Sequence, residues 1–383
     1  MKPYTERANK LKKEFSLYDE KQLTESALEV KLQTFHSSVG VEESIKNRPE
    51  ILSPFSAISD NGIEENMHFI YPLFKHKKVA KSEEVIILMH GLNERSWDKY
   101  LPWAERLATD TGKLVILFPI SFHINRAPNV WSNPRAMMPY VKERKERIGQ
   151  AHSLSFLNIA LSDRLSDSPF RFYSSGKQTI INLTNLVSRI KRGDHPYIKK
   201  DAKVDIFAYS IGGLISQLLL MSNPEDLFSD TKLFLFCSGS VFLEMNGDSK
   251  SIMDSAAFST LRYYYDKLFT GTNNPSVSTL VNQKINESFQ NMISLRRKDE
   301  REAFYSHTRD RIKTLSLKKD RVIPTTGITK SLGDMFVKNS HSELDFAFDY
   351  THENPFPTNK KDITDLVDQS FDTVFSRAAS FLA

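Results

Sequence analysis

Ser210 is the residue whose sequence surroundings most clearly suggest covalent chemistry. The apolar residues 204–208 lead to it, and the helix-like segment 214–220 follows closely. This order predicts a strand, a sharp turn with Ser210 at its apex, and a helix. Such a turn requires small residues two positions before and after the serine, which Ala208 and Gly212 supply. A hydroxyl exposed there, beside the free N–H groups of a starting helix, could attack a carbonyl carbon. The alternative is a buried serine in an ordinary turn.

A serine hydroxyl is a poor nucleophile until a base takes its proton, and an acid must orient that base. The sequence offers both groups after later apolar segments. Asp320 lies in a polar turn after residues 311–317, and His352 lies in a loop after residues 344–350. We expect each side chain at the carboxyl end of a strand, on the edge of the sheet that carries Ser210.

A third element of this chemistry follows the apolar residues 84–89, which run directly into His90-Gly91-Leu92. Glycine allows a sharp backbone turn, so the N–H of Leu92 could face the reacting carbonyl. With the N–H of Ile211 it would form an oxyanion hole, in which each donor typically contributes roughly 3–4 kcal/mol of transition-state stabilisation. His90 is predicted to hold the loop by hydrogen bonding and not to act as a base.

The elements that must position these groups are short apolar strands separated by segments of helix length. Strands without a polar face indicate a mostly parallel sheet with helices on both faces, an α/β fold. The predicted strands are residues 67–74, 84–89, 114–119, 204–208, 232–237, 311–317 and 344–350, and helices are predicted at 97–109 and 363–381.

From about residue 67 to residue 383 the chain resembles the α/β-hydrolase superfamily. The resemblance is carried by His90-Gly91, Ala208-x-Ser210-x-Gly212, Asp320-x-Val322-x-Pro324 and His352, in the chain order Ser, Asp, His. It implies an α/β-hydrolase fold, a Ser210–His352–Asp320 triad, and Leu92 and Ile211 as oxyanion donors. Ala208 stands where glycine is common, and it is small enough to fit. One fold hosts many functions, so the resemblance says little about the substrate.

The expected organisation is an N-terminal helical extension, residues 1–60, followed by the α/β-hydrolase domain, residues 61–383. Two stretches, about 121–175 and 241–310, are longer than a strand crossover needs. Long insertions in compact α/β domains are often lids or binding loops. We therefore expect a lid built from one or both stretches.

Other residues compete for the assigned roles. Glu244 and Asp248 follow residues 232–237, where some superfamily members place their acid, but the turn at Asp320 matches better. His341 precedes the last predicted strand, so it should lie at the opposite edge of the sheet from His352.

Candidate substrate contacts are Asn93 and Tyr209, next to the oxyanion residues, and His123 and Arg126, after residues 114–119. Arg126, together with Arg135, could receive a carboxylate or phosphate. The alternative, which we favour for the histidine and arginines, is that they pair with acidic residues of the loop or face solvent.

Composition restricts the class of protein. Hydrophobic residues make up 40% and charged residues 26%, which is typical of a globular chain, and a net charge of +5 over 383 residues is too small to indicate nucleic acid or an anionic membrane. The single cysteine, Cys237, excludes an internal disulfide and lies in an apolar run typical of a buried, inert thiol. There is no apolar stretch that could span a membrane and no signal-peptide core, so we expect a cytoplasmic protein.

We expect no cofactor and no metal, because zinc-ligand spacing, a phosphate-binding loop and a dinucleotide fingerprint are all missing from the sequence. The expected reaction is hydrolysis of an ester, or of an amide or thioester, of a small-molecule or acyl substrate through an acyl-enzyme. Two alternatives stay open: an acyltransferase or thioesterase with the same site, and a hydrolase-like binding protein whose triad is idle. The oligomeric state is left open.

Overall fold

The computed structural model describes residues 2–20, 23–24, 26–42, 53–149, 152–269 and 280–383. These residues contain an eight-stranded sheet with the order β1-β2-β4-β3-β5-β6-β7-β8. β2 is antiparallel to both its neighbours, and the pairs from β4 to β8 are parallel. The strands are β1 Leu28–His36, β2 His68–His76, β3 Ser82–Met89, β4 Leu114–Phe118, β5 Ile198–Tyr209, β6 Leu233–Phe236, β7 Ile312–Leu317 and β8 His341–Leu344. This is the sheet of an α/β-hydrolase fold, which confirms the predicted fold class.

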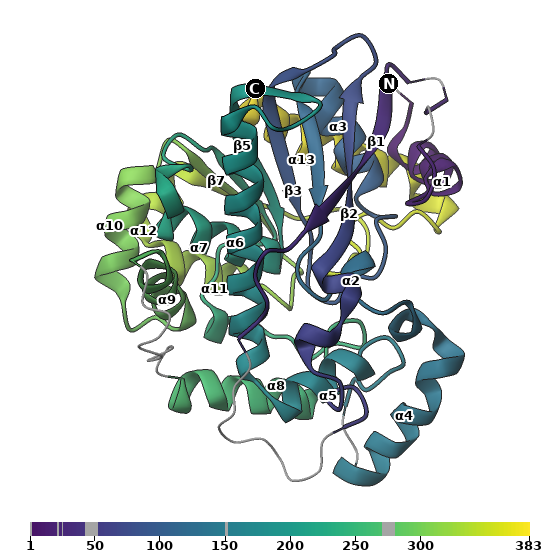
Figure 1. The fold of residues 1–383 in the computed structure, drawn as a ribbon, viewed down its shortest axis with the longest axis vertical. Helices are drawn as coiled ribbons and strands as arrows, with labels where there is room; N and C mark the ends of the chain where they lie inside the picture. The colour runs from purple at the N-terminus through teal and green to yellow at the C-terminus, as the bar shows by residue number, and fades with distance from the viewer. Residues whose placement is uncertain (1, 21–22, 25, 43–52, 150–151, 270–279) are drawn as a thin grey trace.

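Helices cover both faces of the sheet (Figure 1). They are α1 Tyr4–Glu14, α2 Glu64–Met67, α3 Leu101–Thr111, α4 Pro134–Ile148, α5 Ile159–Asp167, α6 Phe170–Arg192, α7 Ile211–Ser222, α8 Ser255–Tyr263, α9 Leu280–Ile293, α10 Lys298–Thr308, α11 Thr325–Leu332, α12 Asp334–Ser340 and α13 Thr364–Leu382. Within the described ranges, no helix combines the length and the apolar character needed to cross a bilayer.

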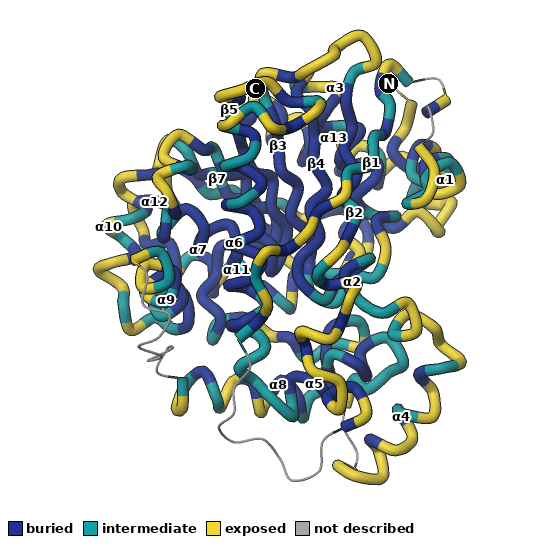
Figure 2. The backbone as a smooth tube through the Cα atoms, in the orientation of Figure 1, coloured by how far each residue is buried: buried dark blue, intermediate teal, exposed yellow. Residues whose placement is uncertain are grey.

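The apolar strands produce two cores, one on each side of the sheet. In β3, Val85, Ile87 and Met89 belong to the core that includes α6 and α7. The alternate residues Ile86 and Leu88 belong to the core that includes α1, α3 and α13. Because successive side chains of a strand point to opposite faces, a strand buried on both sides must be apolar throughout. Figure 2 shows that the central strands are buried along most of their length.

Three helices, α4, α5 and α8, lie together beyond the carboxyl ends of the central strands (Figure 1). With residues 152–158 and 249–254, which lead into α5 and α8 and are hydrogen-bonded to one another, these helices are called the cap here. The buried Arg144 of α4 connects them. Its guanidinium donates two hydrogen bonds to Asp254, at 2.7 and 3.0 Å, and one to Asp163 of α5, at 2.5 Å. Asp254 in turn accepts the N–H of Ala257 and so caps the first turn of α8. One arginine therefore joins all three helices through buried charge pairs.

The N-terminal segment differs from the predicted helical extension. Helix α1 ends at Glu14, and Leu28–His36 forms the edge strand β1, paired with β2 along its whole length. Leu28 and Val30 point into the core while Glu29 and Lys31 do not, which is the alternation of a strand and not the spacing of a helix. The described residues among the first 60 thus do not form a separate helical unit. The part of this prediction at residues 43–52 lies outside the described residues.

The second expected insertion, 241–310, divides between two places. α8 belongs to the cap, whereas α9 packs against α7 on the flank of the sheet, and α10 contacts α9, α11 and α12. Phe289 of α9 lies directly against Gly176 of α6. Most of residues 280–308 therefore cover a face of the sheet and do not reach the cap. Residues 270–279 of this insertion, and 150–151 of the first one, lie outside the described ranges.

The last strand also lies earlier than predicted, at His341–Leu344 instead of 344–350. Phe346, Phe348 and Tyr350 alternate as they would in a strand, but their rings pack on one another in the loop that follows. The alternation thus reflects an aromatic cluster without sheet pairing. His352 still follows the final strand, as predicted.

Replacing Arg144 with alanine is expected to destabilise the cap by about 3–5 kcal/mol, because it leaves the buried Asp254 without its cation and Asp163 with Arg147 alone. Arg147→Ala is the matched control on the same helix: its side chain is 34% exposed and reaches only Asp163, so it should cost no more than about 1 kcal/mol. Urea denaturation, with hydrogen exchange of α4, α5 and α8, measures both. Equal costs for the two variants would contradict the role given to Arg144.

Candidate active site

Ser210 lies between the end of β5 and the start of α7, with φ 56° and ψ −127°. This is a backbone conformation that residues other than glycine rarely adopt. Its N–H donates to the carbonyl of Phe236, at 3.3 Å, and its own carbonyl accepts from the N–H of Gly213 and the hydroxyl of Ser238, at 2.9 and 2.8 Å. The strand–turn–helix with the serine at its apex is therefore present.

The structure explains why small residues surround Ser210. A Cβ at Gly212 would lie 2.7 Å from the carbonyl oxygen of His90, and a Cβ at Gly213 would lie 2.0 Å from the Ser238 hydroxyl. The first turn of α7 thus packs directly on the loop after β3 and on the end of β6. Larger residues would push the serine away from both.

His352 lies in the loop after β8 and is buried with Ser210 and Asp320. Its Nε2 is 2.7 Å from the Ser210 hydroxyl oxygen, and its Nδ1 is 2.7 Å from Asp320 Oδ2. An ionised carboxylate only accepts hydrogen bonds, so Nδ1 carries the proton and Nε2 presents its lone pair to the hydroxyl. The structure therefore brings together the three residues that the sequence placed far apart.

Asp320 is held in position by its own turn. Its second oxygen, Oδ1, accepts the N–H groups of Val322 and Ile323, both at 2.9 Å, which leaves Oδ2 for His352. Cys237 directly follows β6, and burial, with the nearby charge of Asp320, raises the pKa of its thiol well above the usual value. The thiol is buried, as the sequence predicts.

The competing residues Glu244, Asp248 and His341 are not part of the serine–histidine–aspartate chain. Glu244 pairs with Lys330 at 3.2 Å, and Asp248 accepts no hydrogen bond at its buried Oδ1 from any described residue. His341 is the first residue of β8 and bonds the hydroxyl of Thr314 at 2.7 Å. None of these three side chains contacts the serine–histidine pair through a hydrogen bond among the described residues.

Tyr209 holds the loop that carries His352 through two contacts with that residue. Its ring stacks on the imidazole of His352, with centroids 5.3 Å apart and planes at 17°, and its hydroxyl donates to the carbonyl oxygen of the same residue. Burial raises the pKa of Tyr209 well above its usual value, so the hydroxyl stays protonated as a donor. Tyr209 lines the pocket, yet its hydroxyl is used to position His352.

The loop after β3, His90–Asn93, is held by buried hydrogen bonds. His90 Nε2 accepts the N–H of Ile120 at 2.9 Å, so Nδ1 is the protonated nitrogen and donates to the carbonyl of Gly91 at 2.8 Å. Burial holds the pKa of His90 well below its usual value, which keeps the ring neutral. The N–H of Gly91 donates to the Tyr100 hydroxyl at 2.9 Å. These contacts agree with the structural role expected of His90.

The two expected oxyanion donors lie beside the serine. Ile211 is the first residue of α7, where N–H groups have no partner inside the helix. Leu92 lines the same pocket as Ser210. Asn93, which follows, has φ 59°, and its amide donates to the carbonyls of Leu157 and Ser251, at 2.8 and 2.7 Å. Both amide hydrogens of Asn93 thus bind segments of the cap, so it connects the loop to the cap.

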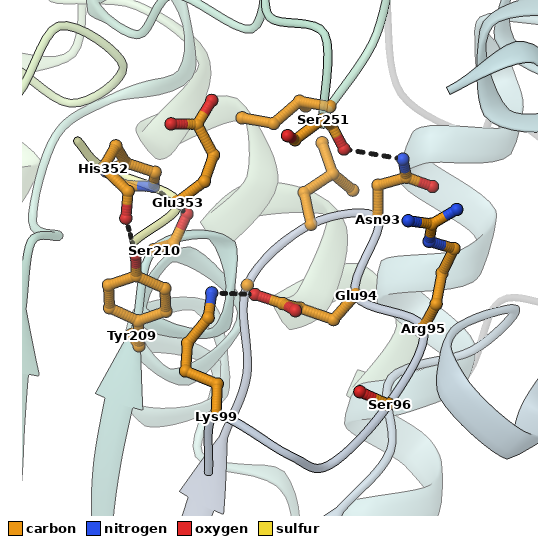
Figure 3. A pocket seen from close by; sticks show the side chains of 13 residues that line it. Asn93, Glu94, Arg95, Ser96, Lys99, Tyr209, Ser210, Ser251, His352 and Glu353 are labelled. Atoms are coloured by element: carbon orange, nitrogen blue, oxygen red, sulfur yellow. Dashed lines mark hydrogen bonds and ion pairs between the residues drawn. The ribbon is translucent and has the colours of Figure 1, made fainter. Parts of the chain in front are cut away.

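A pocket of about 210 Å³ opens between this loop, the histidine loop and the cap (Figure 3). Its walls are strongly polar. They comprise Gly91, Leu92, Asn93, Glu94, Arg95, Ser96, Lys99, Tyr209, Ser210, Ser251, Ile252, His352 and Glu353. Glu94 forms an ion pair with Lys99 and accepts from the Tyr100 hydroxyl at 2.7 Å.

His123 and Arg126 do not reach this pocket, which corrects their selection as substrate contacts. Arg126 is fully buried, donates to the carbonyls of Pro119 and Asn66, and lies over the ring of Phe69. Burial lowers the pKa of His123 to about 4. Both side chains turn inward at the short 3-10 helix Ile124–Arg126 after β4, and the ring of His123 lies beside that of His90, with centroids 5.4 Å apart. Arg135 is exposed at the start of α4.

Sequence reasoning missed the charged wall of the pocket: Glu94, Arg95, Lys99 and Glu353. The first three follow the His-Gly turn within ten residues, and Glu353 follows His352, so proximity to the predicted site was an available signal. Ser251 and Ile252 come from the second insertion and carry no such signal. The described residues contain no group of histidine, cysteine and acidic side chains suited to a metal ion.

Comparison with solved structures gives distant likenesses. Carboxyl esterase 2 of the fungus Tuber melanosporum has a TM-score of 0.43 and 10% identity, and the match covers 100% of this chain and 98% of that one. A bacterial heroin esterase has a TM-score of 0.47 and 11% identity, over 92% and 85%. An esterase of the archaeon Pyrobaculum calidifontis has a TM-score of 0.40 and 12% identity, over 98% and 90%.

The sequence comparisons give a family without an assigned activity. No curated protein matches the chain. A family model, described as a family of unknown function (DUF6051), matches residues 3–383, and the chain belongs to this family.

Proposed function

We propose that this protein is a serine hydrolase that cleaves a carboxylic ester through an acyl-enzyme on Ser210. The observation that carries the proposal is the continuous hydrogen-bonded chain from the Ser210 hydroxyl through His352 to Asp320, with 2.7 Å at each link, at the edge of a pocket. A nucleophile, a base and an orienting acid within hydrogen-bond reach are what acyl transfer requires.

In the first half of the reaction, the Ser210 oxygen bonds to the ester carbonyl carbon while its proton passes to His352 Nε2. The carbonyl oxygen becomes an oxyanion that the N–H groups of Leu92 and Ile211 would stabilise. The bond to the alcohol oxygen then breaks, and His352 returns the proton to the leaving alcohol.

In the second half, His352 takes a proton from water, whose oxygen attacks the acyl carbon. The bond to Ser210 breaks, the serine regains a proton, and the carboxylic acid leaves. Throughout, the Asp320 carboxylate holds the proton on Nδ1 and stabilises the imidazolium that forms twice per cycle. No cofactor enters these steps.

The pocket supports catalysis over an idle triad. A cap side chain that filled the serine pocket would favour a binding protein, but a cavity of about 210 Å³ adjoins Ser210 and His352. That volume is below the range of roughly 300–1,000 Å³ typical of pockets for drug-sized ligands, which favours a small substrate over a long acyl chain. Amides and thioesters remain open substrates of the same chemistry, as does transfer of the acyl group to an acceptor other than water.

Replacing Ser210 with alanine is expected to abolish labelling by a fluorophosphonate probe and to lower kcat for p-nitrophenyl acetate by at least about four orders of magnitude, because the nucleophile is removed. Ser306→Ala, on the exposed surface of α10, is the matched control and should label normally. Labelling that persists in Ser210→Ala would contradict the proposal.

Replacing Asp320 with asparagine is expected to lower kcat by about 10⁴-fold, because an amide no longer selects the Nδ1–H tautomer of His352. Glu244→Gln, which changes the competing acid, should leave turnover near that of the wild type. Circular dichroism and urea denaturation establish that both variants are folded. A larger loss in Glu244→Gln than in Asp320→Asn would overturn the assignment of the acid.

A further inference from the structure

Arg95 is a pocket residue that the reaction described above does not use. It stands three residues after Leu92, on the loop that continues from β3, and it lines the same pocket as Ser210. In Figure 3 it lies on the Asn93 side of the pocket, across from His352 and Ser210. A group on this wall would meet the part of a substrate that extends away from the reacting carbonyl.

The other charged side chains of the pocket are engaged. Lys99 pairs with Glu94, which also accepts the Tyr100 hydroxyl. Burial raises the pKa of Glu353, but hydrogen bonding, chiefly from the Ser249 hydroxyl, outweighs this effect and holds the pKa below its usual value. Arg95, by contrast, has no ion pair and no hydrogen bond to any residue in the described ranges. Its guanidinium carbon lies over the ring of Phe156, 5.9 Å from the ring centroid, in a cation–π contact.

A half-buried guanidinium without a hydrogen-bond acceptor among the described residues is energetically unfavourable, since it has five N–H donors and has lost part of its hydration. Burial lowers the pKa of Arg95, and the charge of Glu94 opposes that shift. The side chain nevertheless stays cationic, because arginine does not lose its proton in proteins. The planar donor set matches the oxygens of a carboxylate or a phosphate.

We propose that Arg95 binds a compact anionic group of the substrate, a carboxylate or a phosphate, so that the enzyme acts on small esters that carry a negative charge. This inference rests on the proposed hydrolase function and specifies its substrate class. Glu353, on the opposite wall beside His352, repels an anion. The two walls together orient the substrate, with its charged end at Arg95 and its ester at Ser210.

The test compares charged esters with neutral ones of similar shape. One pair is 4-acetoxybenzoate and 4-acetoxybenzamide, which places the charge on the alcohol side. The other is mono-4-nitrophenyl adipate and 4-nitrophenyl hexanoate, which places it on the acyl side. In at least one pair the wild type should prefer the anion. Arg95→Met should lower the ratio of kcat/KM, charged over neutral, by roughly 10- to 100-fold.

Two further variants sharpen the comparison. Arg95→Lys keeps the charge without the planar fork and should retain part of the preference. Arg135→Met removes an exposed arginine at the edge of the cap and should leave the ratio as in the wild type. Fluorophosphonate labelling of Ser210 reports whether each variant retains an intact site. If the fluorophosphonate does not label Arg95→Met, the charged-over-neutral ratio of kcat/KM is measured in Arg95→Lys instead.

Competitive inhibition separates the two anions: acetate and inorganic phosphate are tested as inhibitors, and the one recognised should inhibit the wild type more strongly than Arg95→Met. If Arg95→Met turns over substrate and leaves the charged-over-neutral ratio of kcat/KM unchanged in both ester pairs, the role of Arg95 is overturned. The proposed hydrolase function would still stand. Absence of Ser210-dependent turnover and labelling in the wild type overturns the proposed function, and this inference with it.

Discussion

The backbone of Ser210 is held at φ 56° and ψ −127°, and most of the site is built from the contacts that keep it there. A residue in such a conformation costs about 1–3 kcal/mol and persists only when its surroundings impose it. Here the surroundings are the end of β6, through Phe236 and Ser238, and the first turn of α7, through Gly213. The same contacts align β5, β6 and α7. These hydrogen bonds offset the strain at Ser210. They lie at the same edge of the sheet as Cys237 and Asp320.

The loop after β3 is fixed from two sides, which places the expected oxyanion donor between rigid neighbours. On one side, His90 donates to the carbonyl of Gly91 and the Tyr100 hydroxyl accepts the N–H of Gly91. From the other side, Asn93 bonds two carbonyl groups of the cap. Donors act best on a developing charge when they need no rearrangement, so this double support suits electrostatic stabilisation of an oxyanion.

The catalytic candidates were predictable because each depends on a local pattern: an apolar strand followed by a polar or small residue. Strand ends meet at one edge of a parallel sheet, so strand order together with the residue type after each strand predicted Ser210, Asp320 and His352. Arg126 is a residue for which strand order predicted the wrong position. It also follows a strand, but its side chain turns inward to carbonyl groups from distant segments. Strand β1 was missed for a similar reason, since a short alternating segment becomes a strand only through its partner β2.

Three arginines near the site show how placement decides the role of one residue type. Arg126 is buried among carbonyl oxygens, Arg144 is buried between two carboxylates, and Arg95 is half-buried at an open pocket. The first two have the acceptors that a buried guanidinium requires. Only the third faces a space that a ligand can enter, and sequence neighbours alone do not distinguish it from the others.

The cap and the loop after β3 are joined by hydrogen bonds, so a movement of one would strain the other. Arg144 makes α4, α5 and α8 one charge-linked unit, and Asn93 joins the loop to the segments that precede α5 and α8. If the cap opens as a lid, it must either break both hydrogen bonds of Asn93 or carry Leu92 with it. Closure would then restore the pocket wall at Ser251 and the position of the Leu92 N–H in a single step. Substrate admission and assembly of the oxyanion site would be the same conformational event.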